Sequence, residues 1–518
     1  MKPFYITTPI YYVTDAPHIG HLYTSLAADI MSRYHRLKGD NVWFLTGTDE
    51  HGQKIQKKAK ENNETPQELA DRVVERYRKA WTRYEITYND FIRTTEERHK
   101  TVVVSFVDKL MKSGDIYLGG YEGWYCIPDE AYWTEAQLKD GKCPDCGRPV
   151  EWLTEESYFF KMSAYEKRLL EHIEKNPGFI QPESRKNEVL GFIRQGLRDI
   201  SVSRTTITWG IPMPKDPKAT KEHKIYVWFD ALSNYVSALG YPNDSKYTTF
   251  WPEAIHIVGK DILRFHAVYW PTFLMALGLP LPKRIVAHGW LTDGARKISK
   301  SLGNVVDPFA LADTYGVDGV RYFLFREFVF GLDGEYTQDL VYARINADLA
   351  NDYGNCVSRT CSMIIKYLGT SPVEISKALS AHSELKRVAQ AAVAAVDGEM
   401  EQFAYHKALE NLWRAVGEAN RHIESNAPWT LAKSQKPEDR ERLIEVLVHC
   451  REALRMVSVI LLAFIPESAR KALDTLGGAL PDGLAAPVQF AQWGAAGSTM
   501  LVKTPTPLFP RLEVPKTK

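Results

Sequence analysis

The sequence contains few cysteines and no long hydrophobic run. Six cysteines in 518 residues are too few for a disulfide scaffold, and they favour a reducing compartment, so we expect a cytoplasmic protein. No apolar run reaches the roughly 18 residues of a transmembrane helix, so no membrane partner is expected. The opening residues MKPFYITTPIYY lack the apolar core and cleavage site of a signal peptide. We expect them to form the first core strand.

An excess of charge of either sign is also missing. The 65 basic and 64 acidic residues leave a formal net charge of +1. Bulk charge therefore gives no indication of a polyanionic partner, although a local basic face is enough to bind nucleic acid. Hydrophobic residues make up 44% of the chain and charged residues 25%, which is typical of a globular protein.

The first part of the chain alternates between strand and helix signals. Residues 4–12 are aromatic and β-branched and predict a strand, which Pro17 and Gly20 end. A helical apolar period follows up to Gly39, and the next predicted strand, NVWFLTGTDEHG, ends at Gly47. A charged helix is expected over about residues 66–86. This order is typical of a parallel α/β sheet.

The alternation stops near residue 118 and resumes near residue 223 with KIYVWFDALSNYVSAL. We therefore expect an α/β fold, with a Rossmann-type parallel sheet built from residues 1–117 and 223–294 and interrupted by an inserted domain, 118–222. A loop region, 295–340, follows it. Amphipathic segments in residues 341–518 predict an α-helical bundle.

Two histidines flank a glycine in DAPHIGH, where a strand runs into a helix. Amide N–H groups and the helix dipole make such a junction an anion site, and His18 and His21 can donate hydrogen bonds to phosphate oxygens. Gly20 lets a nucleotide approach the backbone. The alternative is a helix cap with two structural histidines.

A second cationic motif is ARKISKSLGN, residues 295–304, which follows the predicted strand RIVAHGW. The flexible ammonium groups of Lys297 and Lys300 suit a triphosphate whose charge builds up during displacement. A solvated surface loop is the alternative.

The two motifs occur together and in order, each at the end of an α/β strand. HIGH and KISKS are the signatures of class I aminoacyl-tRNA synthetases, and KISKS differs from the family form KMSKS by Ile298 in place of Met. The chain resembles the bacterial methionyl-tRNA synthetases of the short form over nearly its whole length. Further segments that carry the resemblance are FLTGTDEHGQKI, YVWFDALSNYVSALG, HIVGKDILRFHAVYWP, HGWLTDGARKISKSLGN and NAPW.

The resemblance implies a reaction and its partners. The chain is expected to ligate L-methionine to tRNA(Met), initiator tRNA included, through a methionyl-adenylate, with ATP and Mg²⁺ as cofactors and release of AMP and pyrophosphate. Residues 118–222 become the connective domain, 295–340 the KISKS loop and stem-contact region, and 341–518 the anticodon-binding domain. We expect the dimerisation module of longer relatives to be absent, and we therefore expect a monomer.

The resemblance also assigns roles to individual residues. It assigns catalysis to His18, His21, Lys297 and Lys300. It assigns ATP binding to Gly20, Gly259, Asp261, His288, Gly289, Ile298 and Ser299. The methionine pocket is formed by Ile10, Tyr12, Asp49, Trp228, Ala231, Leu232, Tyr235 and His266, with Asp49 on the ammonium group. Aromatic walls suit the polarizable thioether. Anticodon reading falls to Asn355, Arg359 and Trp429, which offer stacking and polar edge contacts to single-stranded bases.

A cysteine knuckle lies inside the inserted region. Cys143 and Cys146 form a CxxC pair, and Cys126 and Asp129 have the same spacing. The family often has cysteine at the position of Asp129, which leaves two interpretations open. One is a structural zinc ion on Cys126, Asp129, Cys143 and Cys146, since carboxylate oxygen is an accepted zinc ligand. The other is a knuckle held by packing alone.

Rival functions remain at this stage. Class I synthetases for leucine, valine and isoleucine usually carry a much larger inserted editing domain than residues 118–222 provide, and a cysteine enzyme is a further alternative. A paralogue without catalysis tends to lose the two signatures. A nucleotidyltransferase that adenylylates a small acid is disfavoured by the C-terminal helices with NAPW.

Overall fold

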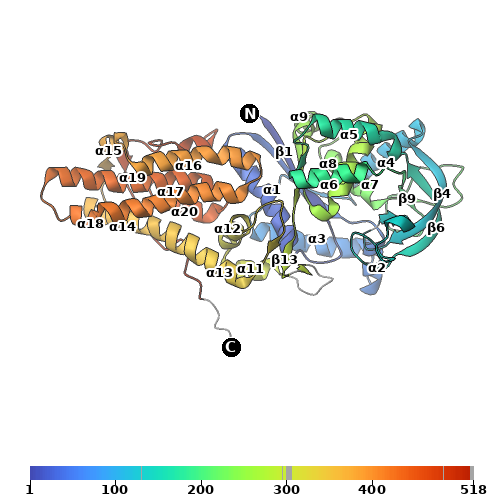
Figure 1. Ribbon diagram of the computed structural model, residues 1–518, viewed down its shortest axis with the longest axis horizontal. Helices are drawn as coiled ribbons and strands as arrows, with labels where there is room; N and C mark the ends of the chain where they lie inside the picture. The colour runs from blue at the N-terminus through green and yellow to red at the C-terminus, as the bar shows by residue number, and fades with distance from the viewer. Residues whose placement is uncertain (130, 295, 299–305, 482, 514–518) are drawn as a thin grey trace. The chain divides into compact units, whose positions relative to one another are not determined.

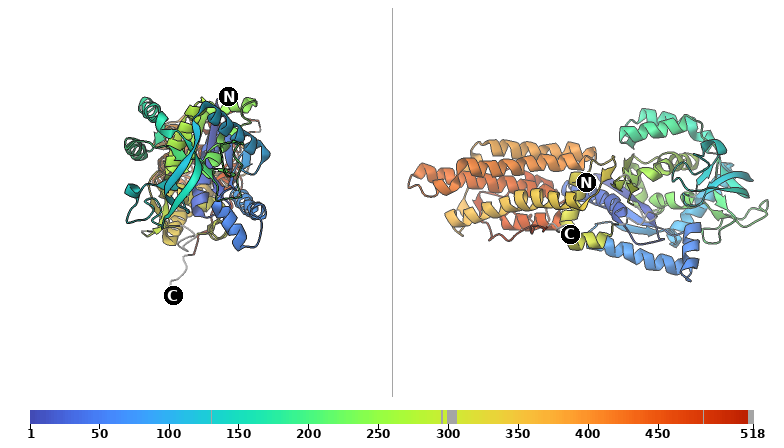
Figure 2. Two further views of the ribbon diagram at one scale, coloured as in Figure 1. Left: turned by 90° about the vertical axis from the view of Figure 1, so that its right-hand side faces the viewer. Right: turned by 60° about the horizontal axis from the view of Figure 1, so that its bottom comes forward.

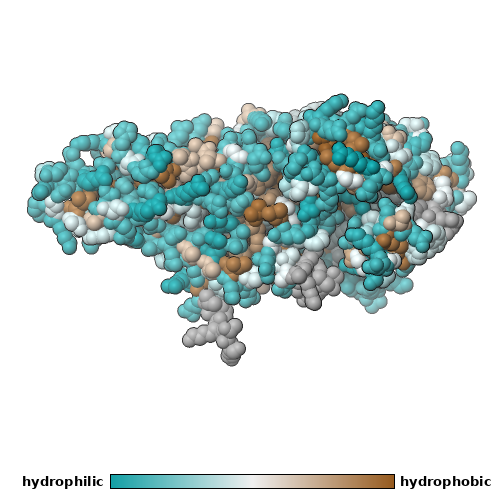
Figure 3. Space-filling view, in the orientation of Figure 1, coloured by the Kyte–Doolittle hydropathy of each residue, from teal (hydrophilic) through white to brown (hydrophobic). Residues whose placement is uncertain are grey.

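The computed structural model describes residues 1–513, apart from 130, 295, 299–305 and 482 (Figure 1). The chain divides into two compact units. Unit 1 comprises Met1–Lys2, Asp29–Val42 and Gly289–Lys518, and unit 2 comprises Pro3–Ala28 and Trp43–His288. Among the described residues, no helix has the length and apolar character needed to cross a bilayer. On the face shown in Figure 3, hydrophilic residues predominate and hydrophobic ones gather in small separate patches.

Unit 2 is built on a six-stranded sheet, which confirms the expected α/β class. Its strand order is β3-β2-β1-β11-β12-β7. The pairs β2–β3, β1–β11, β11–β12 and β12–β7 are parallel. The strands are β1 (Pro3–Tyr12), β2 (Asn41–Asp49), β3 (Asp90–Arg93), β7 (Ile180–Gln181), β11 (Ala254–Gly259) and β12 (Arg284–His288). The central strands read as apolar runs because both faces of the sheet are covered.

Helices connect these strands. They are α1 (Ile19–Leu37), α2 (Gln53–Glu61), α3 (Pro66–Arg83), α4 (Glu97–Ser113), α9 (Ser245–Phe250) and α10 (Trp270–Leu277). Helix α3 begins at a capping box, in which Thr65 accepts from the Glu68 amide and the Glu68 side chain accepts from the Thr65 amide. It ends three residues earlier than the expected limit near residue 86, and β2 runs on to Asp49 instead of ending at Gly47.

The expected insertion contains two kinds of structure. Strands β4 (Ile116–Cys126), β5 (Ala131–Trp133), β6 (Glu151–Phe160) and β8 (Ile200–Ser201) form a separate sheet in the order β5-β4-β6-β8, with antiparallel pairing. The chain then returns through α5 (Glu166–Lys175), adds β7 to the edge of the main sheet, and continues into α6 (Glu183–Ile193). Segment 118–222 thus contributes to the main sheet as well as to its own.

The segment KIYVWFDALSNYVSAL is mostly helical. Only Lys224–Ile225 form a strand, β10, which pairs with β9 (Ser203–Arg204) outside the main sheet. The aromatic run continues as α7 (Val227–Leu232) and α8 (Asn234–Ser237). Short apolar runs do not distinguish a strand from a buried helix, and here both helices are buried.

The part of unit 1 that starts at Gly289 opens with a small sheet and continues as helices. The sheet has the order β14-β13-β15, with β13 (Leu291–Asp293), β14 (Arg296–Lys297) and β15 (Gly334–Glu335). Helices α11 (Pro308–Tyr315), α12 (Val317–Glu327) and α13 (Gln338–Arg344) lead to a π-helical segment, Ile345–Gly354, and then to α14 (Asn355–Leu368).

A helical bundle completes unit 1, which confirms the expected helical region in the C-terminal part of the chain. Helices α16 (Glu384–Glu401), α17 (Tyr405–Asn426) and α19 (Pro437–Leu461) run side by side in Figures 1 and 2 and pack on one another. Residues 446–461 of α19 are all buried, so this helix forms the centre of the bundle. The smaller elements are α15 (Ser376–Ser380), α18 (Pro428–Leu431), α20 (Pro466–Thr475) and the pair β16 (Val373–Glu374) and β17 (Thr499–Met500).

Candidate active site

Two imidazoles lie in contact, tilted relative to each other, at the start of α1. The His18 and His21 rings lie 3.9 Å apart, centroid to centroid, at an interplanar angle of 31°. The Gly20 amide donates to His18 Nδ1 at 3.0 Å, and the His18 amide donates to His21 Nδ1 at 3.2 Å. Backbone amides can only donate, so both Nδ1 atoms are acceptors and each neutral ring carries its proton on Nε2. In this form the Nε2–H group of each ring is a donor at a helix N-terminus, a position that suits an anionic ligand.

Gly20 is required by this arrangement. A Cβ atom at this position would lie 2.9 Å from Cε1 of His18, which is closer than carbon atoms approach one another. Any other residue would push the His18 ring aside. The absence of a side chain at Gly20 therefore leaves room for the His18 imidazole and also exposes the backbone.

His288 is joined to this helix through Thr24, a residue that the sequence analysis did not identify. Thr24 Oγ1 donates to the Gly20 carbonyl at 3.1 Å, and it lies 2.7 Å from His288 Nε2. The hydroxyl has one proton, so His288 Nε2–H donates to Thr24. In the sequence, the position of Thr24 four residues after Gly20 on a predicted helix could have indicated that these two residues are neighbours. No sequence pattern indicated that Thr24 contacts His288.

Gly259 and Asp261 lie beside His288. The register pairs Gly259 with His288 at the carboxyl ends of β11 and β12. A Cβ atom on Gly259 would lie 2.6 Å from Asp261 Oδ1, so the glycine leaves room for this carboxylate. Open α/β sheets bind ligands at the carboxyl ends of their strands. The structure therefore brings together, within unit 2, the residues His18, Gly20, His21, Gly259, Asp261 and His288 at one edge of the sheet.

The residues of the expected methionine pocket form an aromatic cluster. Tyr235 and His266 are each 1% exposed, and the tyrosine hydroxyl lies 2.7 Å from His266 Nε2. His266 Nδ1 lies 3.0 Å from the Ile262 carbonyl, which can only accept. Nδ1 therefore carries the proton, and Tyr235 donates to Nε2. Burial lowers the pKa of His266 to about 4, so the imidazole is neutral at physiological pH.

The cluster has a stacked wall. The Trp228 and Phe265 rings lie 3.8 Å apart with an interplanar angle of 4°, and Trp228 meets His266 edge to face at 6.3 Å. Phe265 and His266 belong to a π-helical segment, Phe265–Tyr269, a type of distortion frequent at functional sites. Of the other pocket residues, Ala231 and Leu232 are buried on α7, whereas Ile10 and Tyr12 are half-buried at the end of β1.

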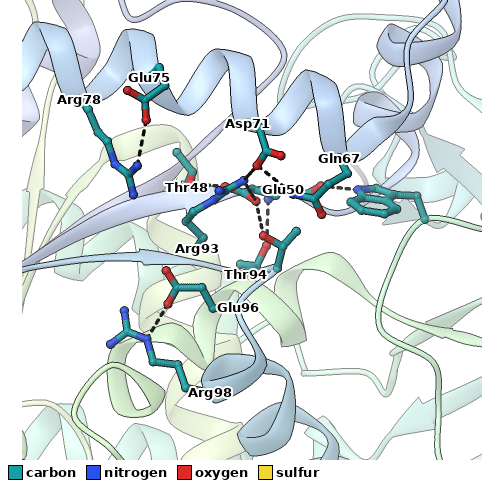
Figure 4. Close-up of polar contacts among 12 residues, drawn as sticks. Thr48, Glu50, Gln67, Asp71, Glu75, Arg78, Arg93, Thr94, Glu96 and Arg98 are labelled. Atoms are coloured by element: carbon teal, nitrogen blue, oxygen red, sulfur yellow. Dashed lines mark hydrogen bonds and ion pairs between the residues drawn. The ribbon is translucent and has the colours of Figure 1, made fainter.

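Asp49 is buried at the carboxyl end of β2, next to a glutamate whose role the sequence analysis did not predict. Glu50 is completely buried and accepts from the Thr48 and Thr95 hydroxyls and from Nε and Nη2 of Arg93, at 2.5–3.0 Å. Figure 4 shows Arg93 between Glu50 and Asp71 of α3. This network fixes the backbone that carries Asp49. Arg93 lies on the neighbouring strand, which local sequence does not indicate.

A second buried carboxylate connects the same turn to α7. Asp230 lies 2.7 Å from His51 Nδ1 and 2.7 Å from His99 Nε2. Burial opposes ionisation of Asp230, but His51 and His99 prevail and lower its pKa. Since Asp230 precedes Ala231 and Leu232, this contact fixes the pocket helix against the residues that follow Asp49.

The KISKS segment is described only in part. Lys297 ends β14, where its backbone pairs with Thr292, and Ile298 is 3% exposed with its amide bonded to the Leu291 carbonyl. The side chain of Lys297, and the residues Ser299 and Lys300, lie outside the described part of the chain. Gly289 packs against Leu332, whose carbonyl oxygen would lie 2.1 Å from a Cβ atom there.

The cysteine knuckle brings four ligand atoms together. Asp129 Oδ2 lies 3.1 Å from Cys143 Sγ and 3.5 Å from Cys126 Sγ, and Cys126 and Cys146 are 3.5 Å apart through sulfur. All four atoms lie within 4.8 Å of one another. Tetrahedral zinc with Zn–S bonds of about 2.3 Å separates its sulfur ligands by about 3.8 Å, so the donor set fits this ion. Burial raises the pKa of Cys146 to about 12, which a bound dication would reverse.

The three residues of the expected anticodon site lie around one end of the bundle. Asn355 is exposed at the first position of α14, and Arg359 follows one turn later, on the same face as expected. Arg359 donates to Glu424 near the end of α17 at 2.5 Å. Trp429 lies in α18, just beyond α17, and is 36% exposed. Their roles as base-binding residues stay predictions.

Comparison with known proteins agrees with this arrangement. A family profile described as "tRNA synthetases class I (M)" matches residues 4–151 and 147–361. The methionine–tRNA ligase of Caldanaerobacter subterraneus subsp. tengcongensis is 49% identical over 517 residues, which cover 99% of this chain and 80% of that protein. The methionine–tRNA ligase of Rickettsia bellii is 51% identical over 478 residues, 92% of either chain.

Solved structures give the same result for the fold. The Mycobacterium tuberculosis methionyl-tRNA synthetase in complex with methionyl-adenylate has a TM-score of 0.90 and 41% identity, and the match covers 99% of this chain and 100% of that one. The free form of that enzyme has a TM-score of 0.85 and 39% identity, with 99% of either chain covered. This chain therefore belongs to the methionyl-tRNA synthetases, a family of class I aminoacyl-tRNA synthetases.

Proposed function

We propose that this chain ligates L-methionine to tRNA(Met) with ATP, and that the edge of the six-stranded sheet described above is its active site. The observation that carries the proposal is that unit 2 holds both a cluster of imidazole donors and a buried aromatic pocket, and that the π-helical segment of the pocket begins four residues after Asp261. Imidazole donors lie at the start of α1, and an aromatic pocket with a neutral histidine lies on α7 and the π-helical segment. The first suits phosphate and the second suits a thioether.

In the first step, a methionine carboxylate oxygen attacks the α-phosphorus of ATP, and the bond to the bridging oxygen of pyrophosphate breaks. Negative charge moves onto the leaving pyrophosphate. His18 and His21, which carry their protons on Nε2, donate hydrogen bonds to this charge, and Lys297 and Lys300 add cationic charge. Bound Mg²⁺ would neutralise phosphate oxygens. No protein nucleophile takes part, so catalysis rests on positioning and charge stabilisation.

The nucleoside part of ATP is assigned to the neighbouring strand ends. Asp261, for which Gly259 leaves room, would accept from a ribose hydroxyl, and the backbone of Gly259 and Gly289 would border the nucleotide. His288, oriented by Thr24, would flank the adenine, and Ile298 and Ser299 would border the bound nucleotide.

The proposed methionine site consists of one carboxylate and a set of apolar side chains. Asp49 would pair with the substrate ammonium group, and Glu50 with Arg93 would fix its backbone. The side chain would lie against Tyr12, Trp228, Leu232, Tyr235 and His266. Because Tyr235 donates to His266 and His266 donates to the Ile262 carbonyl, neither group would donate to the sulfur, and the thioether would be held by contact with the polarizable aromatic rings.

In the second step, a ribose hydroxyl of the terminal adenosine of tRNA attacks the carbonyl carbon of the adenylate, and AMP leaves. Asn355, Arg359 and Trp429 are proposed to read the CAU anticodon, in initiator as well as elongator tRNA. Exposure of Asn355 and Trp429 supports this role, because unpaired bases bind by stacking and polar edge contacts. We further propose that the enzyme is a monomer.

We propose that Cys126, Asp129, Cys143 and Cys146 bind one structural zinc ion. The close approach of their ligand atoms supports this assignment. All four positions of a tetrahedral ion would be occupied by protein, which leaves no open position for catalysis. Metal analysis of the purified protein is expected to give one zinc per chain, and a chain free of metal after purification without chelators would contradict it.

Isotope exchange between pyrophosphate and ATP tests the reaction. Methionine is expected to support exchange, whereas leucine, valine, isoleucine and cysteine are not. Transfer of labelled methionine to initiator and elongator tRNA(Met) tests the second step. Exchange driven by another amino acid, or no transfer to either tRNA, would refute the assignment.

A further inference from the structure

A half-buried arginine connects the cysteine knuckle to the wall of the methionine pocket. Arg264 immediately precedes Phe265, whose ring stacks on Trp228 at 3.8 Å. The guanidinium of Arg264 is turned toward the knuckle and donates to Asp145 Oδ2 at 3.1 Å. Asp145 lies between Cys143 and Cys146 in sequence, inside the CxxC turn.

The guanidinium also lies among aromatic rings. Its central carbon is 4.7 Å from the Trp133 ring centroid, 5.3 Å from that of Phe192 and 5.5 Å from that of Phe265. Trp133 is buried in one cluster with Cys126 and Cys143, so it belongs to the packing core of the knuckle. A planar cation stacks favourably on such rings, and lysine does not reproduce this geometry.

These contacts form a continuous series within unit 2. It runs from the knuckle turn through Asp145 to Arg264, then to Phe265 and Trp228. Arg264 is the point at which two packing systems meet, since its side chain touches the knuckle while its backbone enters the π-helical segment that carries Phe265 and His266.

We propose that Arg264 is a positioning residue for methionine recognition, through which the knuckle holds the Phe265–Trp228 wall in its binding geometry. The inference rests on the proposed function, because it assumes that Trp228 borders the substrate side chain. Arg264 touches neither the histidines of α1 nor the strand ends assigned to ATP among its described contacts. Substitution of Arg264 should therefore weaken methionine binding without changing ATP binding.

The test compares Arg264→Met, Arg264→Lys and Asp145→Asn in the full-length holoenzyme. Arg264→Met keeps much of the side-chain volume but removes the ion pair and the stacking cation. We expect it to raise KM for methionine roughly tenfold, within the range of coupling through packed networks, while KM for ATP and kcat change less than about threefold. Arg264→Lys and Asp145→Asn should give smaller increases in the same direction.

Equilibrium dialysis with labelled methionine gives the dissociation constant independently of catalysis and should show the same order of variants. The double variant Arg264→Met with Asp145→Asn should bind methionine no worse than Arg264→Met alone, because both substitutions interrupt one connection. Arg98→Met is the matched control: Arg98 is another arginine of unit 2, paired with Asp90 and Glu96, and it should leave KM for methionine unchanged.

The outcomes separate this inference from the proposed function. If the wild-type chain shows no methionine-dependent exchange, the proposed function fails. If it does, and KM for methionine in Arg264→Met and Asp145→Asn stays within twofold of wild type, the role of Arg264 is overturned. An increase confined to variants that have lost metal, as measured by metal analysis, would also overturn it, because the effect would then come from collapse of the knuckle.

Discussion

Substitution of Thr24 by valine tests the link between the helix of the HIGH signature and His288. Valine keeps the shape and β-branching of threonine but removes the hydroxyl. Both of its hydrogen bonds are lost, the 3.1 Å bond to Gly20 and the 2.7 Å bond from His288. His288 is 6% exposed, so water does not readily replace the lost partner. The imidazole beside Gly259 would lose the hydrogen bond that joins it to α1.

The expected cost follows from these contacts. A buried polar group left without a partner costs about 1–3 kcal/mol. If about 2 kcal/mol of that cost falls on nucleotide binding, KM for ATP rises roughly 30-fold. Methionine binding should change little, because the described contacts of Thr24 do not involve the aromatic cluster.

The assay is pyrophosphate exchange with either substrate varied. Thr24→Ser is the matched control, because it restores the hydroxyl and should return KM for ATP to within about threefold of wild type. Equal KM values for ATP in the valine variant and the wild type would refute the reasoning. So would a parallel increase in KM for methionine, which would indicate a general loss of structure.

Three other results are expected. His18→Asn and His21→Asn should each slow adenylate formation roughly a hundredfold while the methionine dissociation constant changes less than threefold; equal losses in both would contradict a role on phosphate. The pKa of His266 is about 4 in the fold, below its unfolded value, so unfolded chains bind more protons than folded ones between about pH 4 and 6.5. The free energy of unfolding should therefore decrease as the pH is lowered from about 6.5 to 4. His266→Gln should make this decrease smaller in urea unfolding, and an unchanged pH dependence would contradict the assignment. Glu452 is buried between Arg451 and Arg455, so Glu452→Gln should lower the free energy of unfolding of unit 1 by about 3–5 kcal/mol. Glu384→Gln, in an exposed pair with Arg387, should have no measurable effect on it. Similar unfolding curves for the two variants would refute this difference.

The sequence by itself determined the fold class and the family. Strand and helix signals are local, and the alternation up to residue 117 predicts a parallel sheet whatever the distant contacts are. The two signatures, the CxxC spacing and the Asn355–Arg359 spacing are also properties of short segments. The aromatic run at Val227–Leu232 shows the limit of such reasoning, because its apolar composition fits a buried helix as well as a strand.

Only the tertiary structure decided how the site residues are oriented. Thr24 and His288 are 264 positions apart, and Arg264 and Asp145 are 119 apart, so no local pattern indicates either pair. The same holds for Glu50 with Arg93, which neighbouring strands bring together. The proton positions on His18, His21 and His266 follow from which backbone groups face each ring nitrogen. Composition and spacing select the chemical groups, but strand register and helix packing set their partners, because those contacts join residues far apart in the chain.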